Sequence, residues 1–295
     1  MKRIKTIALF LIGLLALTYF TGCVERGFDE NSDITVISRE DGSGTRGAFV
    51  ELFGVEQRDE SEKKIDATVP TADITQSTGV MMTSVSLNTS AIGYISLGSM
   101  NERIKALKID NAEASIENIK NGSYKISRPF NIVTKDNLSE VAQDFIKFIL
   151  SSEGQKVVED SGYIAASDKA AYDGTKPSGK IAIAGSSSVS PVMEKLKEAY
   201  LAINTNATIE INQSDSTTGV NSVIEDICDI GLASRELKES EISSGLTATP
   251  IAIDGIVVIV NNKNTVDNLS VEQVRKIYMG EITKWSEISN KSKDE

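Results

Sequence analysis

Residues 34–53 have the sequence ITVISREDGSGTRGAFVELF, in which a glycine-rich turn joins a strand pattern to a helix pattern. Ile34–Ser38 is a short and mostly apolar run, and Thr45–Phe53 places its apolar residues on one helical face. Between them, Asp41-Gly-Ser-Gly-Thr45 supplies free backbone N–H groups and hydroxyls where the helix begins. Such a turn favours an anion, because these donors and the helix dipole point at one spot.

Two later segments share this design. Gly185-Ser-Ser-Ser-Val189 follows the strand pattern Lys180–Ala184, and Ser214-Asp-Ser-Thr-Thr-Gly219 follows the strand pattern Thr208–Asn212. One such turn alone is most often a simple helix cap. Three of them in one chain indicate a binding site for a small oxyanion. Arg39 precedes the first turn by two residues, and its guanidinium can pair two oxygens of a tetrahedral anion, although pairing with a neighbouring carboxylate is the alternative.

From Asp33 onward, short apolar runs alternate with amphipathic stretches, which is typical of an α/β fold. The polar stretch 167–179, which contains Pro177 and two glycines, predicts a linker. The remaining strong patterns predict helices at 79–87, 139–150, 191–203 and from Ser270 to Gly280, and strands at 91–95 and 251–260.

The composition excludes several classes of function. The 295 residues contain no histidine, which removes Ser-His triads and most zinc sites. Neither a Gly-Lys-Ser/Thr phosphate loop nor a Gly-x-Gly-x-x-Gly fingerprint is present, and the carboxylates are scattered. We therefore expect no enzyme activity, no cofactor and no metal. The net charge of −11 argues against nucleic acid as a partner.

The N-terminus has the pattern of an export signal. Three basic residues precede the apolar run 6–20, and the small pair Thr21-Gly22 precedes Cys23. We predict a signal peptide over 1–22, a lipid on Cys23 that anchors the mature chain to the membrane, and a polar tether over 23–32. The alternative is a retained transmembrane anchor, for which the run is short. Either way the rest of the chain lies outside the cytoplasm. Cys228 is then the single remaining thiol, in an apolar context that predicts a buried side chain.

Nine segments, among them Arg39–Thr45, Gly185–Pro191 and Asp254–Asn261, carry a resemblance to one family, the phosphate-binding subunits of phosphate ABC importers. Five resemble the C-terminal part of that subunit: Arg39–Thr45, Ala91–Ser96, Ser127–Pro129, Ser152–Gln155 and Ser161–Tyr163. Four resemble its N-terminal part: Gly185–Pro191, Asp229–Arg235, Asp254–Asn261 and Ile282–Glu287. The order of the two parts is swapped, so the chain resembles a circular permutant in which the linker 167–179 joins the old ends. A rearrangement artefact and fragments of two tandem paralogues are the rival interpretations.

The resemblance implies a two-lobed periplasmic-binding fold of type II with hinge crossovers near 127–134 and 251–260. One lobe would be continuous over 128–257, and the other split into 33–127 and 258–295. It also implies a monomer that binds inorganic phosphate, closes around it, and delivers it to a membrane permease. Because the new N-terminus lies close to Arg39, we expect weaker affinity than in an unpermuted relative.

The resemblance further implies the ligand residues. They are Arg39, Ser43, Gly44, Thr45, Ser188, the Val189 amide and Ser216, with Asp41 orienting the arginine.

One departure concerns the proton of hydrogen phosphate. Where relatives place an Asp acceptor after a serine, this chain has Ala233-Ser234-Arg235. Ser234 still matches a phosphate contact, and we expect Asp254 to supply the acceptor, with a turn-capping role as the alternative. The competing functions are binding of sulfate or molybdate, a phosphate-ester enzyme, and a phosphate sensor or non-binding remnant.

Overall fold

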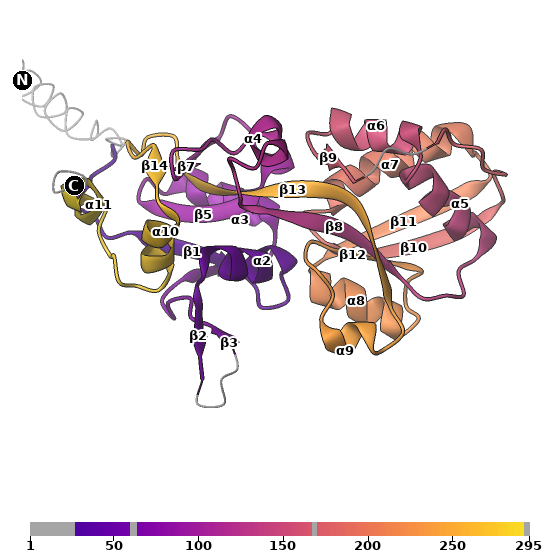
Figure 1. Ribbon diagram of the computed structural model, residues 1–295, viewed down its shortest axis with the longest axis horizontal. Helices are drawn as coiled ribbons and strands as arrows, with labels where there is room; N and C mark the ends of the chain where they lie inside the picture. Colours follow the sequence, from indigo (N-terminus) through magenta and orange to yellow (C-terminus); the bar gives the residue numbers. More distant parts are fainter. Residues whose placement is uncertain (1–26, 60–63, 167–169, 292–295) are drawn as a thin grey trace, which may run out of the picture.

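Two strands pass between two lobes in the computed structural model of the protein, which describes residues 27–59, 64–166 and 170–291 (Figure 1). They are β8 (Ser127–Thr134) and β13 (Thr247–Asn261), which pair antiparallel with Arg128 opposite Asp254. Both coincide with the crossovers expected from the sequence. The two-lobed α/β fold is therefore confirmed, whereas the permuted origin of the chain stays a prediction.

The first lobe contains the elements before β8 and those after β13. Its strands are β1 (Thr35–Arg39), β2 (Glu56–Arg58), β3 (Lys64–Asp66), β4 (Asp73–Thr75), β5 (Ala91–Ser96), β6 (Ile104–Ala106), β7 (Lys108–Ile109) and β14 (Asn268–Leu269). Its helices are α2 (Gly44–Phe53), α3 (Thr78–Leu87), the 3₁₀ turn η1 (Leu97–Ser99), α4 (Ile116–Lys120), α10 (Val271–Tyr278) and α11 (Ser286–Lys291).

The second lobe is built from the chain between the two crossovers. Its strands are β9 (Ile164–Ala165), β10 (Gly179–Ser186), β11 (Ala207–Ser214) and β12 (Ile230–Ala233). Its helices are α5 (Glu140–Ile149), α6 (Ser152–Asp160), α7 (Ser190–Ile203), α8 (Ser216–Ile224) and α9 (Glu239–Ile242).

A single path of strands runs through both lobes in the order β11-β10-β12-β8-β13-β5-β1-β4. β10 pairs parallel with β11 and β12, and β1 pairs parallel with β4 and β5. The carboxyl ends of β1, β4, β10 and β11 each lead into a helix, at the position where open α/β sheets bind ligands.

The hydrophobic cores divide at the crossovers. The cores of the first lobe take buried residues from 36–126 and 256–288, and those of the second take buried residues from 130–252. Ile256 and Val257, which the sequence analysis assigned to the continuous lobe, pack instead in the first lobe. The boundary between the two lobes on β13 therefore lies slightly earlier than predicted. Successive side chains from Ile256 onward point to opposite faces of the strand, and both faces pack in cores of the first lobe.

Local sequence signals explain the helix ends. The Ser43 hydroxyl accepts the Arg46 N–H at the start of α2, which ends at Gly54 in the left-handed conformation (φ 67°). Ser270 and Gln273 form the predicted capping box of α10. The β2–β3 hairpin and α6 were not predicted, and Cys228 is buried as expected.

The first and last described segments of the chain lie side by side. The Ile34 N–H donates to the Thr283 carbonyl at 2.7 Å, and the rings of Phe28 and Trp285 meet at 5.9 Å. The predicted signal peptide and Cys23 fall outside the described residues. Within the described ranges, none of the helices has the length and apolar character needed to cross a membrane.

Candidate anion-binding site

Four helices begin where the two lobes meet, and their first turns bring together a cluster of buried hydroxyls. α2 and α3 come from the first lobe, and α7 and α8 come from the second. Each helix start follows the carboxyl end of a strand, as the sequence predicted for three of them. Because a helix N-terminus carries partial positive charge and free N–H groups, this arrangement favours an anion between the lobes.

Ser188 lies at the centre of the hydroxyl cluster and contacts the opposite lobe. Its Oγ lies 2.8 Å from Thr45 Oγ1 and 3.2 Å from Thr78 Oγ1, and in both pairs either oxygen is able to donate. Ser188 and Thr45 are almost completely buried. The structure thus joins two predicted ligand residues that are 143 positions apart in the sequence.

Ser234 and Ser216 form the second part of the cluster. The Ser234 N–H donates to Ser216 Oγ at 3.1 Å, and Ser186 Oγ donates to Ser234 Oγ at 3.0 Å. Gly44 faces these serines from the other lobe. A methyl group on Gly44 would lie 2.4 Å from Ser216 Oγ and 2.7 Å from Ser234 Oγ. The approach of the lobes therefore requires glycine at this position.

Arg39 provides the positive charge of the cluster, and its side chain is only 2% exposed. Nη1 donates to Thr78 Oγ1 at 3.4 Å, and Nη2 donates to Ser187 Oγ at 3.1 Å. The remaining donors face Glu40, which accepts from both Nε and Nη2 at 2.7 Å. The guanidinium is therefore held by a fork of two charge-assisted bonds.

The prediction that Asp41 orients this arginine is wrong. The Asp41 side chain is 97% exposed, and its carboxylate accepts from Arg46 Nη1 at 2.6 Å. Arg46, in the first turn of α2, draws Asp41 outward and leaves the buried guanidinium to Glu40.

Two other groups that were predicted to contact phosphate, the Val189 amide and the Asp254 carboxylate, bond instead to groups of the protein. The Val189 N–H donates to the Ser186 carbonyl at 3.0 Å. Asp254 accepts from Ser96 Oγ at 2.8 Å and from Arg128 Nη2 at 3.1 Å, so both carboxylate oxygens have partners. Burial raises the pKa of Asp254 to about 6, although Arg128 and Ser96 lower it. Asp254 is therefore buried against Ser96 and Arg128, which corrects the expectation that it faces the ligand as a proton acceptor.

Two members of the cluster, Thr78 and Ser187, were not predicted. Thr78 belongs to Gln76-Ser-Thr-Gly79, a fourth turn of hydroxyl residues and glycine between a strand and a helix. The same signal that identified the other three turns could have found it. Among the described residues, no group of acidic or cysteine side chains is arranged to hold a metal ion.

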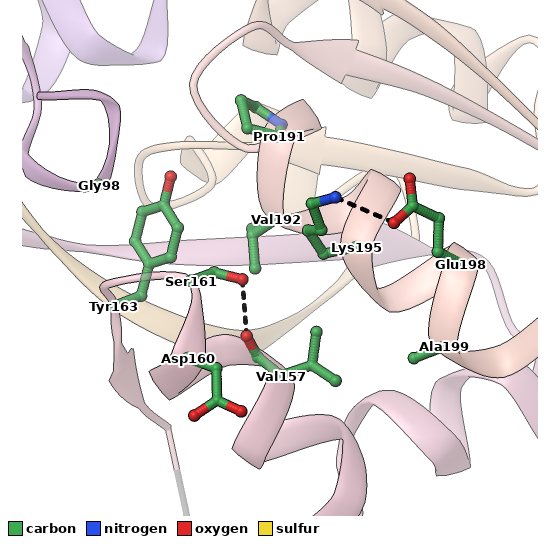
Figure 2. A pocket seen from close by; sticks show the side chains of 10 residues that line it. All are labelled: Gly98, Val157, Asp160, Ser161, Tyr163, Pro191, Val192, Lys195, Glu198 and Ala199. Carbon is green, nitrogen blue, oxygen red and sulfur yellow. Dashed lines mark hydrogen bonds and ion pairs between the residues drawn. The ribbon is translucent and has the colours of Figure 1, made fainter. Parts of the chain in front are cut away.

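A separate cavity of about 660 Å³ lies between α6 and α7 of the second lobe (Figure 2). Gly98 of the first lobe and Tyr163 border it. Several polar side chains drawn there have partners of their own, since Lys195 pairs with Glu198 at 3.0 Å and Ser161 Oγ donates to the Val157 carbonyl at 2.7 Å. The buried Tyr163 hydroxyl, in contrast, has no hydrogen-bond partner within the described part of the chain. The lining residues of this cavity are distinct from the hydroxyl cluster.

Comparisons with known proteins agree with this architecture. A family model described as "PBP superfamily domain" matches residues 25–153 and 170–295. The phosphate-binding protein PstS 2 of Streptococcus agalactiae serotype V is 51% identical over 292 residues, covering 98% of this chain and 100% of its own. The phosphate-binding protein PstS 2 of Streptococcus pneumoniae serotype 4 is 47% identical over 256 residues, covering 86% and 87%. A crystal structure of a phosphate-binding protein of a phosphate ABC transporter from Streptococcus pneumoniae TIGR4 is 46% identical, with a TM-score of 0.69, and covers 87% of this chain and 100% of its own.

Proposed function

Because this chain belongs to the PstS family of phosphate-binding proteins within the PBP superfamily, we propose that it captures inorganic phosphate between its lobes and delivers it to the permease of an ABC importer. It is a binding protein and not an enzyme. The observation that carries the proposal is the meeting of Arg39 with hydroxyls from both lobes at four helix N-termini.

The ligand residues that we propose come from both lobes. Arg39, Ser43, Gly44, Thr45 and Thr78 belong to the first, and Ser187, Ser188, Ser216 and Ser234 belong to the second. A tetrahedral anion held by donors from both sides favours the closed form, because opening the lobes removes half of those donors. A permease that recognises the closed form would thereby receive the loaded protein.

We propose that the protein works outside the cytoplasm as a monomer, tethered through a lipid on Cys23. The basic, apolar and small residues before Cys23 support this location. The first described residues, from Gly27, follow closely after this position, so the folded lobes would lie near the membrane surface.

Two observations support a circular permutation. The first and last described segments are hydrogen-bonded, with the Ser286 N–H donating to the Glu30 carbonyl at 2.7 Å, as expected where a formerly continuous segment is cut. The linker that would join the old ends is held by Asp144, which accepts from the Tyr172 hydroxyl and the Thr175 N–H. The end-to-end match with the Streptococcus agalactiae relative counts against an assembly artefact.

The test is calorimetric titration of the lipid-free mature chain with phosphate, sulfate and molybdate, with a phosphate-ester turnover assay on the same preparation. We expect phosphate to bind selectively and to stabilise the fold by about 4 kcal/mol at a thousand times its dissociation constant. Arg39→Met should abolish measurable binding, whereas Arg103→Met, which changes an exposed arginine of the same lobe, should leave it unchanged. Preference for another anion, or ester turnover, would contradict the proposal.

A further inference from the structure

A buried ion pair lies directly behind the hydroxyl cluster and joins the two crossover strands. Arg128 of β8 and Asp254 of β13 are opposite each other in the sheet, and their side chains are 2% and 0% exposed. Arg128 Nε and Nη2 both donate to Asp254 Oδ2, at 3.3 and 3.1 Å. Neither residue belongs to the set of phosphate contacts proposed above.

The pair is bonded to both lobes. On one side, the Asp254 carboxylate accepts from Ser96 Oγ, at the end of β5 in the first lobe, at 2.8 Å. On the other side, Arg128 Nη1 donates to the Ser234 carbonyl at 3.1 Å, in the second lobe. One continuous series of hydrogen bonds therefore connects the first lobe, both crossovers and a proposed ligand serine.

Arg128 is one of the contacts that hold the loop that carries Ser234. Ser234 itself also bonds to Ser216 and Ser186, which are members of the hydroxyl cluster. The Asn131 amide, also on β8, donates to the next carbonyl, of Arg235, at 3.0 Å. β8 thus holds two successive carbonyls of the loop from behind.

General energetics indicate that stability alone does not explain the pair. Replacing a buried ion pair by well-packed neutral side chains is often neutral or stabilising, because both charges must be desolvated. The planar guanidinium fixes the geometry between its two partners, because one edge donates to Asp254 and the remaining nitrogen donates to the Ser234 carbonyl.

We propose that Arg128 and Asp254 are positioning residues, which set the phosphate affinity by fixing Ser234 relative to the hinge although they do not contact phosphate. This inference rests on the proposed function, because Ser234 must be a ligand residue for its position to matter.

The experiment measures phosphate titration and thermal unfolding in parallel for the lipid-free chain. Arg128→Met combined with Asp254→Asn removes both charges and so leaves no buried ion without a partner. We expect this double variant to fold cooperatively and to bind phosphate at least tenfold more weakly than the parent chain. Arg128→Lys, which retains the charge but loses the planar fork, should weaken binding in the same direction and serves if the double variant fails to fold.

Two further variants separate positioning from stability. Asp144→Asn changes another buried carboxylate, one that binds Tyr172 and Tyr200 far from the cluster, and should lower the melting temperature without changing the affinity. Ser234→Ala removes the hydroxyl that Arg128 is proposed to position. In this variant, the Arg128 substitution should therefore lower the phosphate affinity by a smaller factor than it does in the parent chain.

The results distinguish a failure of the positioning role from a failure of the proposed function. Phosphate affinity within twofold of the parent chain in a folded Arg128 variant, or full additivity with Ser234→Ala, would overturn the positioning role. If the parent chain itself does not bind phosphate, the proposed function fails instead.

Discussion

Replacing Gly44 with alanine should separate ligand binding from folding. Gly44 begins α2, and an added methyl group would lie 2.4 Å from Ser216 Oγ and 2.7 Å from Ser234 Oγ across the interface between the lobes. Real side chains do not tolerate such distances, so both hydroxyls would have to move. They are two of the proposed phosphate donors, and moving them removes donors as well as close packing.

The expected changes in affinity and stability follow from comparing the closed and open forms of the hinge. In the closed form the methyl group overpacks the interface, which typically costs about 1–3 kcal/mol and corresponds to a loss of affinity of roughly five- to 150-fold. In an open form the clash is relieved, and alanine loses less backbone entropy than glycine on folding; because Gly44 is the first residue of α2, the gain stays below the roughly 0.5–1 kcal/mol of a helix interior. Ligand-free stability should therefore stay equal or rise while affinity falls.

The assay combines phosphate titration with chemical unfolding in the absence of phosphate. Gly47→Ala is the matched control, because it lies on the same helix and a methyl group there meets only the Arg235 side chain, at 3.9 Å. Because Gly47 lies inside the helix, this variant should gain helix stability and keep the parent affinity. If Gly44→Ala binds phosphate as tightly as the parent chain, the lobes do not approach as the structure shows and the argument fails.

Three further predictions concern other groups. Glu40→Gln should weaken phosphate binding about tenfold by releasing the guanidinium it holds, whereas Asp41→Asn should stay within twofold of the parent affinity, both measured by titration. Burial raises the pKa of Cys228 to about 11, so in a Cys23→Ser variant this thiol should react with a disulfide reagent only after unfolding. Burial alone would raise the pKa of Glu241, but the hydrogen bonds and the charge of Arg235 lower it by more, so the pKa lies below its ordinary value. Its stabilising contribution should thus be lost as the pH falls below the ordinary range of a glutamate, and urea unfolding of Glu241→Gln should depend less on acid.

The parts of the site that follow local rules could be predicted from the sequence. A strand pattern, a turn of glycine and hydroxyls, and a helix pattern place Thr45, Ser188 and Ser216 at helix N-termini whatever the rest of the fold does. The structure then brings these turns together from both lobes. The strand over 251–260 was predictable for a similar reason, since its mostly β-branched residues favour a long buried strand, whereas its role as a crossover was implied by the family resemblance.

Side-chain pairing was not predictable, because it depends on competition in space. Asp41 and Glu40 are both close enough in sequence to reach Arg39. Arg46, in the first turn of α2, forms an ion pair with Asp41, and this leaves Glu40 to pair with Arg39. Asp254 was expected at the ligand because it begins an apolar stretch at a lobe junction. Its partner Arg128 is 126 positions away and becomes visible only when β8 and β13 are paired in register.

The position of the chain ends bears on the expected weakness of a permuted protein. We expected a cut close to Arg39 to loosen its strand, but the structure holds β1 along its whole length. β1 pairs with β4 and β5 on its two sides, the Ile34 N–H bonds to the Thr283 carbonyl, and the Arg39 N–H donates to the buried Tyr94 hydroxyl at 3.1 Å. The bonds that fix the backbone of Arg39 thus come from residues distant in sequence, and its guanidinium is held by the adjacent Glu40. A cut before residue 33 removes none of these bonds. The structure therefore removes the physical reason for a weaker site, because the contacts made by β1, and not the continuity of the chain before it, determine where the guanidinium lies.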